Sequence, residues 1–175
     1  MKKVFAFVLT AAMLLSLAAC STAAKTDRVD ETPAAEQTQT DNTQIPNPWT
    51  DYDSLDEAIA AAGFDCTIPD AIDGCSEKAF RVLDADGETM LEVIYADGET
   101  EIARVRKAPG TENISGDYNA YDAQDVAVGD VTVTMKSADG LVKLAIWQDG
   151  GYTYAVSVEA GLSADAMAEL VSQIG

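Results

Sequence analysis

Apolar and polar residues alternate along six segments of the chain, which is the period of a β-strand with one buried face. The predicted strands are residues 79–84, 90–95, 101–106, 131–136, 141–147 and 152–158. Asp-Gly pairs follow or separate several of them, in Ala85-Asp86-Gly87, Ala96-Asp97-Gly98, Ala138-Asp139-Gly140 and Gln148-Asp149-Gly150. Because Asp-Gly favours tight hairpin turns, we expect consecutive strands to pair antiparallel.

The length of each turn sets the register of the strands that it joins. A two-residue turn at Asp86-Gly87 places Arg81 opposite Glu92. In the next hairpin a two-residue loop would place Arg104 opposite Leu91, whereas a three-residue loop, 97–99, places it opposite Glu92. We prefer the second register, because it keeps charged side chains together and apolar side chains together.

Helical signals occur at both ends of this strand-rich region. Ser54 followed by Glu57 forms a capping box for a helix over 55–62, which Gly63 ends. Near the C-terminus Ser163 is an N-cap, and the apolar residues that follow recur at helical spacing at Met167, Leu170, Val171 and Ile174. The predicted fold class is therefore α+β: an antiparallel β-sheet of about six strands with an N-terminal and a C-terminal helix packed on it.

The first residues are typical of an export signal. Lys2 and Lys3 precede an uncharged, mostly apolar run, which is shorter than a membrane-spanning helix. The run ends in Leu17-Ala18-Ala19-Cys20, which resembles the lipobox of bacterial lipoproteins. The resemblance implies a signal peptide over 1–19 and a diacylglyceryl anchor on Cys20, at the extracytoplasmic face of the cell membrane; an ordinary signal peptide is the alternative.

We expect residues 20–49 to form a lipid-anchored, disordered linker and residues 50–175 to form a single α+β domain. The linker is rich in Thr, Ala, Gln, Asp, Glu and Pro and contains few large apolar residues. Such a composition cannot bury enough apolar surface to offset the entropy of ordering.

Charge and composition exclude several functions. The formal net charge is −19, which argues against nucleic acid as a partner. The chain has no histidine, so it cannot form a Ser-His-Asp or Cys-His catalytic system by itself. We predict no enzymatic activity, no cofactor and no metal site.

Two cysteines remain once Cys20 is lipidated. In an exported protein Cys66 and Cys75 are natural disulfide partners, and their bond would close the loop around Pro69. The alternative is two buried free thiols.

From about residue 50 onward the chain resembles a domain-of-unknown-function family. This family occurs in Gram-positive lipoproteins and in the extracytoplasmic part of some anti-sigma-factor-like proteins. The resemblance implies the fold class and an extracellular setting, and no catalytic residues. It is carried by Gly63-Phe64, Ile68-Pro69, Arg106-Lys107-Ala108, Ile114-Ser115-Gly116-Asp117-Tyr118, Trp147, Gly151-Tyr152 and Leu162-Ser163.

Two regions contain candidate binding residues. The loop from Pro109 to Asp130 is long, and it contains Asp117, Tyr118, Asn119, Tyr121, Asp122 and Asp125. Oxygen ligands with aromatic residues suit calcium or a glycan, although no spacing matches an EF-hand; the alternative is a structural crossover. On the sheet's outer face we expect a docking surface for a partner, formed by Arg81, Arg104, Arg106, Lys143 and Trp147. The alternative is that the basic residues only make ordinary cross-strand pairs with Glu92.

The leading hypothesis is a surface-tethered, non-enzymatic binding or sensing module of the cell envelope. Its partner would be a cell-wall component or another envelope protein. The second hypothesis is a carrier of lipids or other hydrophobic ligands, which requires an apolar cavity between sheet and helices. The third is a domain that binds calcium or a glycan through the 109–130 loop.

Overall fold

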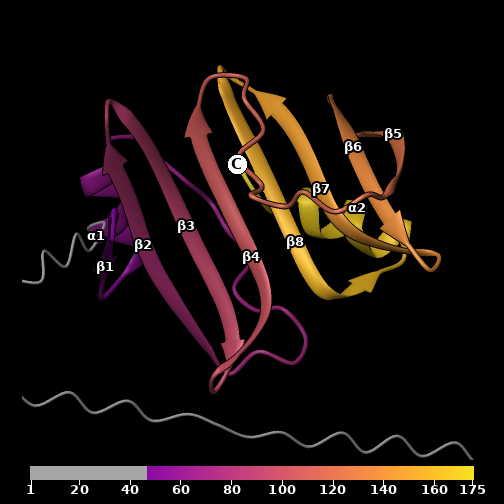
Figure 1. Cartoon of the computed structure of the whole chain (residues 1–175), viewed down its shortest axis with the longest axis horizontal. Coiled ribbons are helices and arrows are strands. Elements are labelled where there is room, and N and C mark those ends of the chain that lie inside the picture. The colour runs from indigo at the N-terminus through magenta and orange to yellow at the C-terminus, as the bar shows by residue number, and fades with distance from the viewer. Residues whose placement is uncertain (1–46) are drawn as a thin grey trace, which may run out of the picture. The chain divides into compact units, whose positions relative to one another are not determined.

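All six predicted strands form, and they belong to one antiparallel sheet of eight strands (Figure 1). The computed structural model describes residues 47–175. The predicted signal peptide, the lipidation site Cys20 and the linker up to residue 46 lie outside the described residues. The strands are β1 (Trp49–Tyr52), β2 (Glu77–Ala85), β3 (Glu88–Asp97), β4 (Thr100–Pro109), β5 (Asp122–Val128), β6 (Val131–Ala138), β7 (Leu141–Asp149) and β8 (Tyr152–Leu162).

The strand order across the sheet is β1-β2-β3-β4-β8-β7-β6-β5. Each half has four antiparallel strands in chain order, with α1 between β1 and β2, and the halves join where β4 pairs with β8. Because β4 lies at the centre and β5 at an edge, the segment 110–121 must cross one face of the sheet to connect them. It passes in front of β8 and β7 in Figure 1.

The prediction of about six strands missed both edge strands. The first, β1, has only four residues, too few to establish an alternating pattern. The other, β5, lies within the predicted loop 109–130, and only its Val126 and Val128 are large apolar residues. An edge strand with one partner buries little, so its sequence carries little strand signal.

Both predicted helices form, as α1 (Leu55–Ala62) and α2 (Ala164–Val171). The Ser54 hydroxyl accepts a hydrogen bond from the Glu57 amide at 3.3 Å, and the Ser163 hydroxyl accepts one from the Ala166 amide at 3.2 Å. Both helices pack on the same face of the sheet, the helix face, and share one apolar core with it (Figure 1). The opposite face, which the 110–121 segment crosses, is the loop face.

The first hairpin has the predicted register, with Arg81 opposite Glu92. The predicted register of the second hairpin is wrong: Arg106, rather than Arg104, lies opposite Glu92. Asp97 pairs with Thr100, and an extra residue in β4, Ile102, opposite the step between Tyr95 and Ala96 shifts the strands further. Beyond the bulge the total displacement is two residues, so residues 103–106 keep their predicted faces. Before the bulge the displacement is one residue, so Glu101 pairs with Arg104 on the loop face and Ile102 packs against the core.

Cys66 and Cys75 are free thiols, so the structure does not contain the predicted disulfide. The alternative of two buried thiols holds for Cys66 only, since Cys75 is partly exposed. Cys66 is buried in the apolar core, whereas Cys75 packs at its margin. The loop between them is held from the sheet, because the Tyr95 hydroxyl donates a hydrogen bond to the Pro69 carbonyl at 2.7 Å. Burial raises the pKa of the Cys66 thiol to about 11, although the charge of Lys107 acts in the opposite sense.

A chain of residues 21–175 should therefore contain two alkylatable thiols when it is denatured without reductant. In the native chain at pH 8, Cys66 should react at least tenfold more slowly than in denaturant, because its raised pKa alone lowers the thiolate population by about a hundredfold. Mass spectrometry after timed alkylation measures both, with Cys75 as the internal comparison. A native mass two hydrogens lower, with no reactive thiol, would restore the disulfide.

Candidate functional site

Three arginines converge on one carboxylate on the loop face. Glu92 is fully buried at the centre of β3. Arg81 Nε donates to Glu92 Oε1, and Arg106 Nε donates to Oε2 at 2.6 Å. Arg104 Nε lies 3.6 Å from the same Oε2. A buried carboxylate is tolerated only when it is paired and hydrogen-bonded, and here each oxygen accepts a charged donor.

Arg104 extends this cluster to the end of β4. Its Nη2 donates to Glu101, and its Nε is buried without a hydrogen-bond partner in the described part of the chain. Burial by itself lowers the pKa of the guanidinium, but the hydrogen bond to Glu101 and the charge of Glu92 outweigh it and raise the pKa. Arg81, Arg104 and Arg106 therefore pair with Glu92 across strands, which is the alternative to a docking surface.

The tryptophan on this face is Trp49, and the placement of Trp147 here is wrong. The ring of Trp49 lies 5.0 Å from the Arg81 guanidinium and 5.9 Å from that of Arg106, within cation–π range. Trp147 is 4% exposed in the core of the helix face and stacks on Tyr154 with 5.1 Å between ring centroids.

Lys143 reaches the loop face, where its Nζ donates to the Glu159 carbonyl at 2.8 Å. Strict alternation would place Lys143 and Trp147 on one face. An irregularity between Val142 and Leu144 breaks the alternation, so the two side chains separate.

The first half of the 110–121 segment is fastened to the sheet. Arg106 Nη1 donates to the carbonyls of Ile114 and Ser115, at 2.9 and 2.7 Å. Thr153 Oγ1 holds the Gly110 carbonyl at 2.8 Å, and Gln148 Nε2 holds that of Thr111 at 3.0 Å. The predicted 109–130 loop therefore consists of a crossover that is hydrogen-bonded to the sheet, followed by the strand β5.

Within this segment Asp117 organises a tight turn. Its Oδ1 accepts hydrogen bonds from the backbone and side-chain nitrogens of Asn119, and its Oδ2 accepts one from the Tyr121 hydroxyl, each at 2.8 Å. Burial acts to raise the pKa of Asp117, but these hydrogen bonds lower it below its usual value. Tyr118, which lies between Asp117 and Asn119, projects outward and is 95% exposed.

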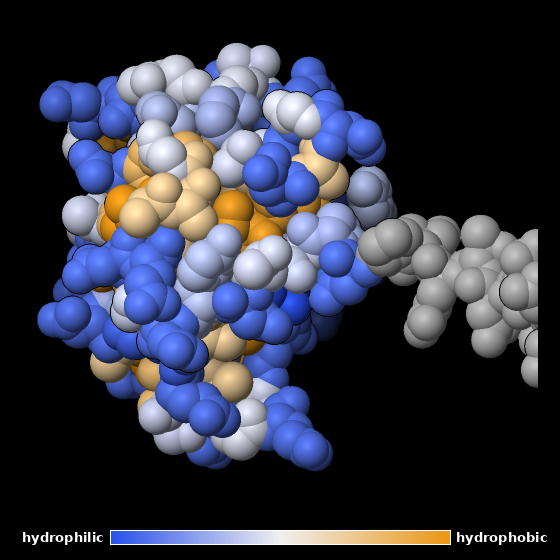
Figure 2. Space-filling view, turned by 90° about the vertical axis from the view of Figure 1, so that its left-hand side faces the viewer, coloured by the Kyte–Doolittle hydropathy of each residue, from blue (hydrophilic) through white to orange (hydrophobic). Residues whose placement is uncertain are grey.

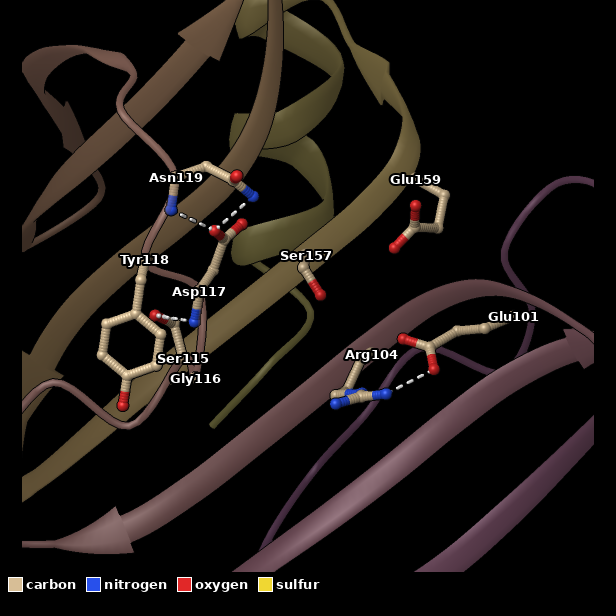
Figure 3. A pocket seen from close by; sticks show the side chains of 9 residues that line it. All are labelled: Glu101, Arg104, Ser115, Gly116, Asp117, Tyr118, Asn119, Ser157 and Glu159. Atoms are coloured by element: carbon tan, nitrogen blue, oxygen red, sulfur yellow. Dashed lines mark hydrogen bonds and ion pairs between the residues drawn. The ribbon is translucent and has the colours of Figure 1, made fainter. Parts of the chain in front are cut away.

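Three clefts border this segment, and together they form the loop groove. The first, of about 540 Å³, lies between the segment and strands β4 and β8 (Figure 3). A second of about 540 Å³ shares Gly116 and Tyr118 with it, and a third of about 240 Å³ shares Asp117, Ser157 and Glu159. In Figure 3 Arg104 and Glu101 face the segment from across the first cleft. Its lining residues are Glu101, Arg104, Ser115, Gly116, Asp117, Tyr118, Asn119, Ser157 and Glu159.

The acidic residues of the predicted loop do not converge on one point. Asp122 and Asp125 belong to β5, where Asp125 accepts a hydrogen bond from Thr134 at 2.7 Å. Within residues 47–175 no group of three Asp, Glu, Cys or His side chains is placed to hold a metal ion. The structure therefore brings together Asp117, Tyr118 and Tyr121, and it gives no support to a calcium site.

Comparisons with protein-family models, with curated proteins and with solved structures find no match to this chain. The resemblance to a family of lipoprotein domains therefore stays a prediction. In the described part of the chain, no helix is both long and apolar enough to cross a bilayer.

Replacing Glu92 with Gln should lower the free energy of unfolding by about 3 kcal/mol, because the three arginines would lose their buried counter-charge. Glu101→Gln is the matched control: Glu101 is partly exposed and pairs with one arginine, so its loss should cost less than about 1 kcal/mol. Urea denaturation of the 21–175 chain measures both. Equal effects would show that burial of Glu92 does not control the cluster.

Gly116→Ala should detach the crossover from the sheet. A Cβ at Gly116 would lie 2.5 Å from Arg106 Nη1, on a backbone with φ of +67°. Hydrogen exchange of amides 114–119 should then accelerate at least about tenfold. Gly110→Ala is the control, since Gly110 also has positive φ but faces open space. If both variants exchange alike, the strain of a side chain at positive φ, rather than loss of the contact with Arg106, would explain the acceleration.

Proposed function

We propose that this chain is a non-enzymatic binding module of the bacterial cell envelope, which recognises its partner in the loop groove. One observation carries the proposal: Tyr118 is almost fully exposed on a segment whose neighbouring backbone groups are hydrogen-bonded to Arg106 and Asp117. Large aromatic side chains usually bury their rings, and ordered, exposed ones are frequent anchors of binding sites. A rigid anchor also loses little entropy when a partner binds.

Other surfaces offer less. Among large apolar residues in the described part of the chain, only Tyr118 and Leu141 are exposed. The edge that carries β1 and α1 shows an apolar band between hydrophilic regions (Figure 2). Half-buried residues of α1 and β2, among them Leu55, Ile59 and Phe80, already pack against the core. The groove around Tyr118 is therefore the strongest candidate for recognition.

The predicted lipid anchor at Cys20 suits this role. A diacylglyceryl group would hold the chain stably at the extracytoplasmic face of the membrane. The linker that follows would let the groove reach partners above the bilayer, in the cell wall or on another envelope protein.

Carriage of a hydrophobic ligand is the second candidate, on the evidence of one cleft. A space of about 450 Å³ lies beside α2 and is lined in part by Ile72, Ile102, Val158, Leu162 and Leu170. The interior between the sheet and α2 is filled, however, by Met167 and Val171. An open cleft covers less of a ligand than the enclosed pocket that a carrier requires.

Binding of the 21–175 chain to isolated cell envelopes of the source bacterium tests the proposal. Tyr118→Ala should reduce the bound fraction at least about fivefold, because it removes the anchor ring. Tyr118→Phe keeps the ring and should bind like the native chain. Both variants should keep the native melting temperature, since Tyr118 contributes little to the core. If Tyr118→Ala leaves the bound fraction unchanged, the groove is not the recognition site.

A further inference from the structure

We infer that the ligand of the loop groove is a neutral oligosaccharide, bound with one pyranose ring against Tyr118. This inference rests on the proposed function and names the chemical class of its partner. Three properties of the groove support this inference: its charge, the pairing on both sides of the strands beneath it, and its combination of one aromatic ring with polar side chains.

The charge of the groove opposes anionic ligands. Three carboxylates, Glu101, Asp117 and Glu159, line the first cleft against the single guanidinium of Arg104. Arg104 is already paired with Glu101 and lies beside Glu92. On a chain of net charge −19, a phosphate-rich polymer or an acidic peptide would be repelled.

The backbone beneath the groove opposes recognition of an extended peptide by strand addition. That mode needs a free sheet edge with unpaired N–H and C=O groups. The strands under the first cleft are β4 and β8, and each is paired on both sides. The first cleft also lacks the apolar pockets that hold peptide side chains, since its lining residues other than Tyr118 are polar, charged or glycine.

The side chains of the cleft match the chemistry of a sugar. A pyranose has one comparatively apolar face of C–H groups, which suits the exposed ring of Tyr118. Its hydroxyls both donate and accept hydrogen bonds, and the cleft offers both kinds of partner in Asn119, Ser157 and Glu159. The neighbouring clefts, which share residues with the first, extend the groove to both sides for further sugar units.

The experiment is competition for Tyr118-dependent envelope binding by three neutral tetrasaccharides: the N-acetylglucosamine tetramer, cellotetraose and maltotetraose. We expect at least one to displace the 21–175 chain and to bind it directly in isothermal titration calorimetry. Tyr118→Ala should weaken that direct binding at least about tenfold, and Tyr118→Phe should keep it within about threefold. Binding of an uncharged ligand should change less than about twofold between low and physiological salt.

Glu159→Gln separates a neutral ligand from a charged one, because it removes one negative charge from the cleft while keeping the side chain's size. A neutral sugar should bind the native chain and this variant with the same weak salt dependence, even if loss of a contact with Glu159 lowers the affinity. Weakening by more than tenfold together with strong salt dependence of native binding would indicate a cationic ligand and overturn the inference. If envelope binding depends on Tyr118 but no tetrasaccharide competes, the inference fails and the proposed function stands. If envelope binding does not depend on Tyr118, both fail.

Discussion

The buried carboxylate of Glu92 is the constraint on which the loop face depends. A charge removed from water must be compensated by close, well-oriented partners, and here the partners come from two neighbouring strands. Arg81 and Arg106 hold its two oxygens, and Arg106 also holds the carbonyls of Ile114 and Ser115. The ring of Trp49 covers both guanidinium groups from the edge strand β1. One carboxylate thus ties the first strand, the centre of the sheet and the crossover to each other.

The two faces of the sheet are stabilised in different ways. The helix face buries an apolar core under α1 and α2, where Trp147 and Tyr154 stack and residues such as Leu91, Val105 and Val156 are fully buried. Within residues 47–175 no helix lies on the loop face, which is covered by a crossover that polar contacts fasten. Side-chain hydrogen bonds to the crossover carbonyls satisfy groups that would otherwise lose their hydrogen bonds to water, and clefts remain on either side of the crossover. This difference explains why the candidate site lies on the loop face.

In the loop groove, the side chains that fix the shape of the site differ from those that are free to contact a ligand. Arg106 and Asp117 spend their hydrogen bonds on the backbone and on side chains of the crossover, so they shape the groove rather than offer themselves to a ligand. The groups left over are the exposed ring of Tyr118 and the polar side chains that line the first cleft, and these are the ones available for recognition (Figure 3). Because the groove carries more negative than positive charge, it favours partners that do not depend on phosphate or carboxylate groups.

Local sequence by itself determined the helices, the six inner strands and the turn at Asp86-Gly87, because caps, alternation and turn residues act over a few positions. It also placed Arg81, Arg104 and Arg106 on one face with Glu92, since a register error of two residues preserves the face. Only the tertiary structure decided which arginine lies opposite Glu92, which tryptophan covers the arginines and where β1 and β5 add to the sheet. Register irregularities in the β3–β4 and β7–β8 pairs, together with pairing at the edges, control these features. They depend on contacts between residues distant in sequence, whose packing energy no local pattern records.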